Sequence, residues 1–199
     1  MDFSSYDKSW EAFENIFNEK LGIKESWNKI IDFHEALKPA TYWSLLKALD
    51  VESEQLDIKD WMEQIAENSP VPKSAIALWI GITKLWDEET QTEYYAVYLN
   101  GSKKYDAEDI DWAATPSYEP EENYGIVNVL TKVSELISGD KDNNALLDWI
   151  LPLSYCVFTI DEIIRENQLN SQLFLRGRKQ LFVTVGFEEG DSVNISPIV

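Results

Sequence analysis

Apolar side chains recur every three or four positions through the first third of the chain, the spacing that gives a helix one apolar face. The pattern predicts a first helix over residues 6–21, a second over Ile23–Leu37 and a third over residues 42–49. Asp57 is the expected N-cap of a fourth helix, because its side chain can accept a hydrogen bond from a backbone N–H of the first turn. Gly22 is expected to end the first helix.

The segment Ser69–Pro72 interrupts this helical pattern, since two prolines within four residues prevent a continuous helix. It separates a helical subdomain, residues 1–69, from an α+β part, residues 73–199. We expect the two parts to pack together as a single domain over residues 1–199, a length that suits one large domain.

Strand patterns begin after this break and predict two hairpins. β-Branched and aromatic residues of Ile76–Ile82 and Tyr94–Leu99 flank turn residues 87–91, which indicates a central hairpin. Alternation over Leu181–Phe187, followed by Ser192–Ile195, indicates a C-terminal hairpin. The predicted fold class is α+β: one antiparallel sheet built from the two hairpins, with the N-terminal helical part and further helices packed on it.

Between the two hairpins the pattern again predicts helices. One covers residues 126–137, and the next is capped by Asn143 or Asn144. Pro152 either kinks that helix or begins a new one in its first turn. Residues 153–159 have the apolar spacing of a helix, but their β-branched and aromatic side chains also suit a strand; the helix is the favoured interpretation.

The segment after the central hairpin is the most acidic of the chain. Residues 106–125 contain seven acidic side chains and no lysine or arginine. Prolines discourage regular structure there and aromatic residues argue against disorder, so we expect a long ordered loop. Its acidic and aromatic residues are the candidate partner-binding residues. They are Asp106, Glu108, Asp109, Asp111, Trp112, Tyr118, Glu119, Glu121, Glu122 and Tyr124.

Trp112 has two interpretations within this loop. Its ring is either a binding hot spot surrounded by carboxylates or an anchor packed under the hairpin. Trp86 also adjoins acidic residues near a turn. For the acidic residues, the simpler interpretation is a solvated surface, and the more specific one is a surface that recognises another protein.

The formal net charge of −19 restricts the possible partners. Nucleic acid is excluded as a partner, because phosphate binding needs clusters of lysine and arginine. An anionic membrane surface is excluded for the same reason, and no apolar segment approaches the roughly 20 residues that span a bilayer. A basic protein is the expected partner, because a strongly acidic surface attracts it electrostatically. The alternative is that the charge only keeps the protein soluble.

The single cysteine, Cys156, cannot form an intramolecular disulfide and suggests a reducing compartment. The N-terminus has no basic region followed by an apolar one, so we expect no signal peptide and a cytoplasmic localisation. His34, the single histidine, lies on the apolar face of the second predicted helix. A structural role for this histidine is favoured over a catalytic one.

The sequence contains no recognisable motif for a cofactor or for catalysis. One histidine and one cysteine cannot build the usual zinc site. The chain has neither a Gly-x-Ser-x-Gly elbow nor a glycine-rich phosphate loop. The spacing of acids does not match a calcium-binding loop that starts at Asp106 or at Asp109. We therefore expect no cofactor and no enzymatic activity; an enzyme with a carboxylate-only site is the competing interpretation.

Two segments carry a family resemblance. One extends from Leu99-Asn100-Gly101-Ser102 through Tyr105-Asp106-x-x-Asp109-x-Asp111-Trp112-Ala113 to Tyr118-x-Pro120 and Tyr124. The other is Val185-Gly186-Phe187-Glu188-Glu189-Gly190-Asp191. Together they resemble a group of small acidic bacterial proteins of uncharacterised function, which look like immunity proteins of polymorphic toxin systems. The resemblance implies a protein that neutralises a toxin, and it implies no catalytic residues.

The sequence therefore predicts a non-catalytic acidic protein that binds a basic protein, with a toxin domain as the leading candidate. A cytosolic housekeeping or regulatory interaction protein with an ordinary acidic surface is the alternative. Mimicry of DNA by carboxylates is a further form of protein binding, and it needs acids spread along an elongated face rather than gathered in one loop.

Overall fold

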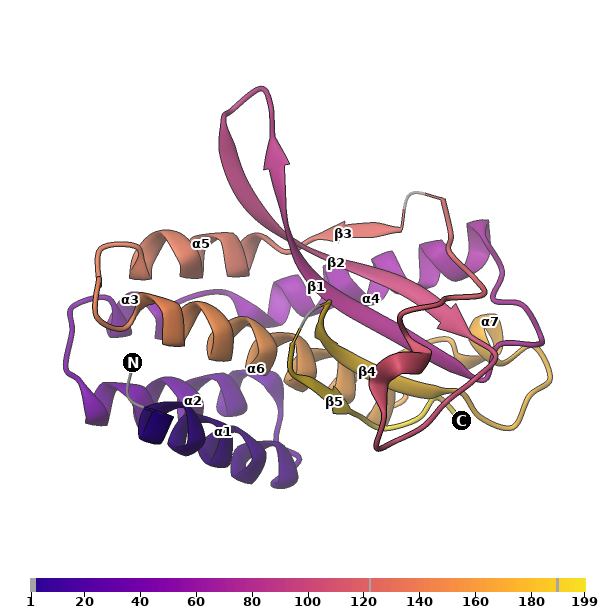
Figure 1. Cartoon of the computed structure of the whole chain (residues 1–199), viewed down its shortest axis with the longest axis horizontal. Coiled ribbons are helices and arrows are strands. Elements are labelled where there is room, and N and C mark those ends of the chain that lie inside the picture. The colour runs from indigo at the N-terminus through magenta and orange to yellow at the C-terminus, as the bar shows by residue number, and fades with distance from the viewer. Residues whose placement is uncertain (1–2, 122, 189) are drawn as a thin grey trace.

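The computed structural model describes residues 3–121, 123–188 and 190–199, and it shows an α+β protein (Figure 1). Its elements in chain order are α1 (Phe3–Asn18), α2 (Ile23–Leu37), α3 (Trp43–Lys47), α4 (Val51–Asn68), β1 (Ala77–Asp87), β2 (Thr92–Ser102), the 3₁₀ turn η1 (Ile110–Trp112), β3 (Tyr124–Ile126), α5 (Asn128–Ile137), α6 (Asn144–Arg165), α7 (Ser171–Leu175), β4 (Phe182–Phe187) and β5 (Ser192–Asn194).

The five strands form one mixed sheet in the order β3-β2-β1-β4-β5. Both predicted hairpins are present, since β1 pairs with β2 and β4 pairs with β5 in antiparallel fashion. The prediction of a purely antiparallel sheet is wrong, however, because β1 and β4 are parallel, with Ala77 opposite Phe182 and Ile82 opposite Phe187. Three helices separate the hairpins, and this long connection returns the chain to the same end of the sheet, as parallel pairing requires.

The two faces of the sheet have different cover. Leu78, Ile80 and Ile82 of β1 belong to the main hydrophobic core, which the helices complete. Trp79 and Gly81 alternate with them and therefore point to the opposite face. No α-helix of the described chain packs on that opposite face; the loop between β2 and β3, which contains η1, crosses it instead (Figure 1).

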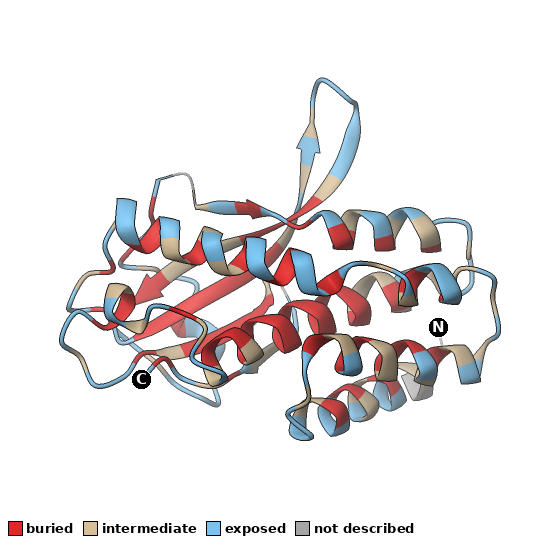
Figure 2. Cartoon of the chain, turned by 180° about the vertical axis from the view of Figure 1, so that it is seen from behind, coloured by how far each residue is buried: buried red, intermediate tan, exposed pale blue. Residues whose placement is uncertain are grey.

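Helix α6 is the centre of the core. Every residue from Ile150 to Asp161 is buried, and Figure 2 shows the helix as a buried rod among the others. It contacts α1, α2, α4 and α5 as well as β1 and β4. Residues on both sides of the Ser69–Pro72 break thus share one core: the ring of Trp27 meets Tyr155 edge-on at 5.8 Å, and Phe13 stacks on Phe158 at 5.5 Å.

Helix α6 is continuous through Pro152, so residues 153–159 are helical as favoured. A proline inside a helix lacks the N–H that would bond to the carbonyl four residues earlier. Here that carbonyl belongs to Asp148, and the hydroxyl of Tyr95 donates to it at 3.1 Å. The sheet thus satisfies the carbonyl that the proline leaves without its helical partner.

Two predicted helix ends are corrected by the structure. Helix α4 begins at Val51 rather than at Asp57, because the side chain of Asp50 accepts a hydrogen bond from the backbone of Ser53 at 3.1 Å. Gly22 does not end α1; Lys20 has the left-handed conformation, with φ of 53°, and Gly22 is the N-cap of α2.

The two residue types most open to a chemical role are buried in the core. Cys156 is fully buried, and burial raises the pKa of its thiol, which disfavours the reactive thiolate. His34 is 3% exposed and stacks on Trp43, and burial lowers its pKa to about 4. Both features support a structural role for His34.

Candidate protein-binding site

The loop between β2 and β3, residues 103–123, is fixed to the open face of the sheet by aromatic packing. Trp112 is 7% exposed and forms a small apolar cluster with Ala77 and Trp79, separate from the main core. Its indole N–H donates to the carbonyl of Asp106 at 3.1 Å. Tyr105 lies beside Trp112 at 5.5 Å and stacks flat on Phe182 at 4.1 Å. These contacts hold the first half of the loop in place.

The second half of the loop is fixed by Tyr118. The Tyr118 side chain is 8% exposed and belongs to the main core, and its hydroxyl donates to the carbonyl of Ser69. The ring lies against Gly101, where a Cβ would be only 3.0 Å from it. Backbone hydrogen bonds join Gly101 to Ser117 and Tyr118. The loop is therefore attached at both ends to buried structure.

The carboxylates of this loop point into solvent. Six of the seven acidic residues are exposed, and Glu122 lies outside the described residues. The six are Asp106, Glu108, Asp109, Asp111, Glu119 and Glu121. None of these six forms an ion pair with a residue that the structure describes. The carboxylates of Asp106 and Asp109 accept backbone N–H groups within the loop, each at 2.9 Å, which orders the turn but leaves the negative charge uncompensated.

A cleft of about 530 Å³ opens beside the loop, over the part of the sheet face that the loop leaves bare. The side chains of Trp79, Tyr98 and Tyr124 are among those that line it. Its carboxylates come from three places in the chain, Asp111, Glu119 and Glu188, and none of the described lining residues is basic. The cleft thus combines aromatic surface with uncompensated negative charge.

Tyr98 is held in position within this cleft. Its ring lies across Gly81, where an added Cβ would be 2.1 Å from the ring, so any larger residue would displace it. Its hydroxyl oxygen accepts a hydrogen bond from the indole N–H of Trp79 at 3.1 Å, and its ring centroid lies 5.9 Å from that of Tyr124. Burial, and in addition the charge of Glu188, raise the pKa of Tyr98, so it stays neutral.

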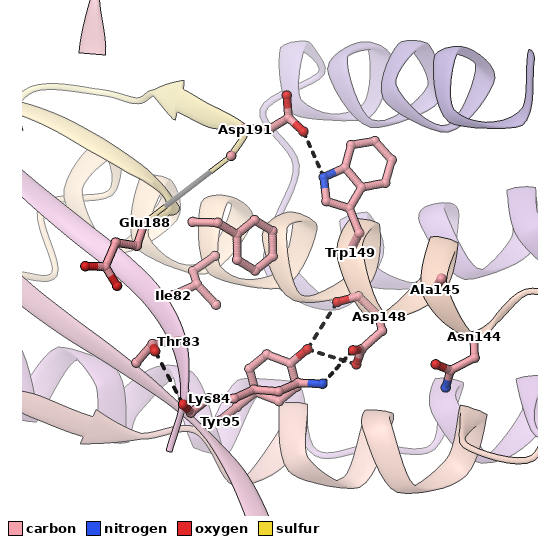
Figure 3. A pocket seen from close by; sticks show the side chains of 12 residues that line it. Ile82, Thr83, Lys84, Tyr95, Asn144, Ala145, Asp148, Trp149, Glu188 and Asp191 are labelled. Atoms are coloured by element: carbon pink, nitrogen blue, oxygen red, sulfur yellow. Dashed lines mark hydrogen bonds and ion pairs between the residues drawn. The ribbon is translucent and has the colours of Figure 1, made fainter. Parts of the chain in front are cut away.

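A second cleft, of about 680 Å³, lies between α6, the base of the β1–β2 hairpin and the β4–β5 turn (Figure 3). Lys84 and Tyr95 both point at Asp148, and the ammonium of Lys84 lies 2.5 Å from one carboxylate oxygen. The hydroxyl of Tyr95 shares its one hydrogen between the other carboxylate oxygen, at 2.9 Å, and the Asp148 carbonyl, at 3.1 Å. Trp149 donates to the carboxylate of Asp191 at 2.9 Å. Because the carboxylates of Asp148 and Asp191 are already paired with Lys84 and Trp149, the second cleft offers a ligand fewer unpaired charges than the first.

Tyr95 of the second cleft is a neutral hydroxyl, and the two clefts share one wall. Burial and the nearby charge of Asp148 raise the pKa of Tyr95, so its hydroxyl is no base. In residues 3–121, 123–188 and 190–199, no group of three or more His, Cys, Asp or Glu side chains is placed to hold a metal ion. The two clefts meet at the β4–β5 turn, because they share lining residues of that turn, Glu188 and Gly190.

The structure divides the described candidate residues of the acidic loop into three groups. Asp111, Glu119 and Tyr124 line the first cleft, and Tyr124 is 52% exposed. Trp112 and Tyr118 are buried, which supports the anchor interpretation of Trp112 and gives both residues a supporting position. Asp106, Glu108 and Asp109 lie outside both clefts, on the surface of the loop. Glu121 lines a third cleft, of about 740 Å³, between the end of the loop and α4.

Sequence reasoning missed three residues of the first cleft, Trp79, Tyr98 and Glu188. Trp79 and Gly81 lie two positions apart on β1, and Tyr98 of β2 pairs with Gly81. A glycine at position 81 was the available signal that an aromatic ring lies across the strand. Trp86, in contrast, is 55% exposed on the part of the β1–β2 hairpin that extends beyond the sheet (Figure 1).

Comparisons with protein-family models, with curated proteins and with solved structures found no match for the chain. None of the helices in the described part of the chain has the length and apolar character needed to cross a membrane. The geometry of the loop and the cleft is therefore the basis for the function.

Proposed function

We propose that the protein acts without catalysis, by binding a basic protein through the acidic loop and the cleft beside it. The observation that carries this proposal is the combination of rigid attachment and free charge. Half-buried Tyr105 and the buried side chains of Trp112 and Tyr118 fix the loop, while its exposed carboxylates have no ion-pair partner among the described residues. A surface that is already ordered loses little conformational entropy when a partner binds.

Charge and aromatic surface have separate parts in this binding. The net charge of −19 attracts a basic partner and accelerates encounter, an effect that weakens as salt shortens the range of electrostatic forces. The aromatic surface of Tyr98 and Tyr124 slows dissociation, because buried aromatic contacts contribute much of the binding energy at interfaces.

The narrower form of this proposal is an immunity protein that neutralises a toxin domain in the cytoplasm of a bacterium. A toxin that cleaves nucleic acid needs a basic surface for its substrate, and an acidic protein can occupy that surface. The resemblance of residues 99–124 and 185–191 to small acidic bacterial proteins supports this form. The coding region beside the gene is a direct check, since an immunity protein is expected next to its toxin.

The test compares two variants with the same net charge. The loop variant carries Asp106→Asn, Asp109→Asn and Asp111→Asn. The control variant carries Asp7→Asn, Glu11→Gln and Glu14→Gln on the exposed surface of α1. The partner is recovered by affinity capture at low salt from the organism that encodes the chain, and association rates are then measured with the purified partner.

The loop variant is expected to associate several-fold more slowly than the control variant, with the difference shrinking as salt rises. Equal rates for the two variants would mean that only the overall charge matters, and the loop would then not be the contact surface. If the affinity capture recovered a neutral or acidic partner, that result alone would contradict the proposal, before any association rate was measured.

A further inference from the structure

The cleft beside the acidic loop is a sheet face without a partner. The loop covers the end of the open face at Ala77 and Phe182 and leaves the other end bare. Two large hydrophobic side chains stand exposed at the cleft: Tyr124 of β3 is 52% exposed and Ile110 of η1 is 38% exposed. Exposed aromatic surface next to a concave site is typical of an interface.

The charges at the cleft define the chemistry of its occupant. Asp111, Glu119 and Glu188 come from η1, from the end of the loop and from the end of β4, so three separate segments place a carboxylate at one cleft. Since no lysine or arginine is found among the described lining residues, an anion is repelled and a cation is favoured.

The aromatic floor selects among cations. Tyr98 and Tyr124 lie 5.9 Å apart on neighbouring strands, and Trp79 fixes the hydroxyl of Tyr98. A guanidinium group is planar, stacks on aromatic rings and donates paired hydrogen bonds to a carboxylate, whereas an ammonium group stays more strongly hydrated. The floor is preformed, because Gly81 allows the ring of Tyr98 to lie flat against the strand.

We propose that this cleft receives an arginine side chain from an exposed segment of the basic partner, with the guanidinium between the aromatic floor and the carboxylates of Asp111, Glu119 and Glu188. The inference rests on the proposed function, since it names the group of the partner that the site recognises. Two observations support the arginine site: the acidic lining of the cleft complements a cation, and the sheet face beneath it is uncovered.

The test uses three capped peptides of the same length that differ at one central residue, which is arginine, lysine or citrulline. Citrulline keeps the planar shape of arginine without its charge. Binding is followed through the indole N–H signal of Trp79 in heteronuclear nuclear magnetic resonance spectra. That N–H bonds to the hydroxyl of Tyr98 and reports directly on the cleft floor. Chemical-shift titration detects weak complexes, so a low affinity does not hide binding.

The arginine peptide is expected to shift the Trp79 signal in a saturable way, the lysine peptide to bind several-fold more weakly and the citrulline peptide to leave the signal unchanged. Glu188→Gln and Tyr124→Ala are each expected to weaken the arginine peptide by about three- to fivefold. Their matched controls, Glu93→Gln and Trp86→Ala on the exposed hairpin, are expected to leave its affinity unchanged.

Equal effects of the arginine and citrulline peptides, or no saturable shift of Trp79, would overturn the inference. So would an affinity that Glu188→Gln and Tyr124→Ala do not alter. Such a failure leaves the proposed function standing if the loop variant still slows association with the recovered partner, because two of its three substitutions, at Asp106 and Asp109, lie outside the cleft. The two proposals can therefore fail separately.

Discussion

Trp112→Ala is expected to release the acidic loop from the sheet without unfolding the protein. The side chain is 7% exposed, and its apolar neighbours Ala77 and Trp79 lie in a small cluster outside the main core. Replacing a buried aromatic residue by alanine costs about 3–5 kcal/mol, and the lower end applies to a cluster at the edge of the protein that can collapse on itself. The figure includes the hydrogen bond to the Asp106 carbonyl, which contributes about 1 kcal/mol.

Hydrogen exchange at Ala113 measures this effect. Its backbone N–H donates to the carbonyl of Ile110 at 2.9 Å, so it exchanges when the loop opens. A loss of about 3 kcal/mol corresponds to exchange that is faster by about two orders of magnitude. Amides of β1 and β4 are expected to remain protected from exchange, because Trp112 is not part of the main core that packs on the other face of these strands.

Trp86→Ala is the matched control for this experiment. Trp86 is 55% exposed on the free end of the β1–β2 hairpin, and its removal is expected to change the unfolding free energy by about 0.5 kcal/mol or less. Unchanged exchange at Ala113 in Trp112→Ala would refute the anchoring role. Loss of protection throughout β1 and β4 would refute the separation of the loop cluster from the core.

Two further predictions concern the core. Val183→Asp places a charge at a position that is 1% exposed and should lower the unfolding free energy by several kcal/mol in urea, whereas Thr92→Asp, at an exposed position of the same sheet, should change it little. Burial lowers the pKa of His34 from 6.5 to about 4, so the unfolded chain binds a proton at this residue more readily than the folded one. The unfolding free energy should therefore fall by up to about 3 kcal/mol as the pH drops from 6.5 to about 4. Urea unfolding of His34→Gln should show no such pH-dependent loss from this residue.

Local patterns in the sequence predicted the elements well where one side of each element is buried. The alternation in residues 181–187 and the helical spacing in residues 126–137 both reflect burial against the same core, and β4 and α5 occupy these segments. Pro152 left the next element ambiguous, because the hydroxyl that replaces its missing hydrogen bond belongs to Tyr95, far away in sequence.

Such patterns could not predict that β1 and β4 pair in parallel. A strand that alternates apolar and small residues has the same sequence signature in a parallel and in an antiparallel pair. The direction depends on the three helices between the hairpins, whose combined path returns the chain to the starting end of the sheet. The start of α4 was missed for a related reason: Asp50 and Asp57 are equally good caps, and only the packing of Val51 in the core distinguishes them.

The acidic loop was identified from composition, but its cleft was not. All three helices of the connection lie between Glu119 and Glu188 in the sequence, and the two residues line one cleft because the chain returns to the sheet beside β1 after these helices. The carboxylate of Glu188 therefore had no local signal that would join it to residues 106–124.

The position of the cleft depends on the connection from β3 to β4, which also makes β4 parallel to β1 rather than antiparallel. The chain between β3 and β4 runs through α5, α6 and α7, and α5 and α6 pack on one face of the sheet. The other face is crossed by the loop that contains η1. A single loop cannot cover five strands, so Tyr98 and Tyr124 stay beside open space, with exposed carboxylates around them. Trp79 and Tyr98 are joined by a hydrogen bond on this face, whereas Tyr124 stays 52% exposed at the cleft. The fold thus leaves a concave surface that is aromatic and acidic, which is the surface that the proposed basic partner would contact.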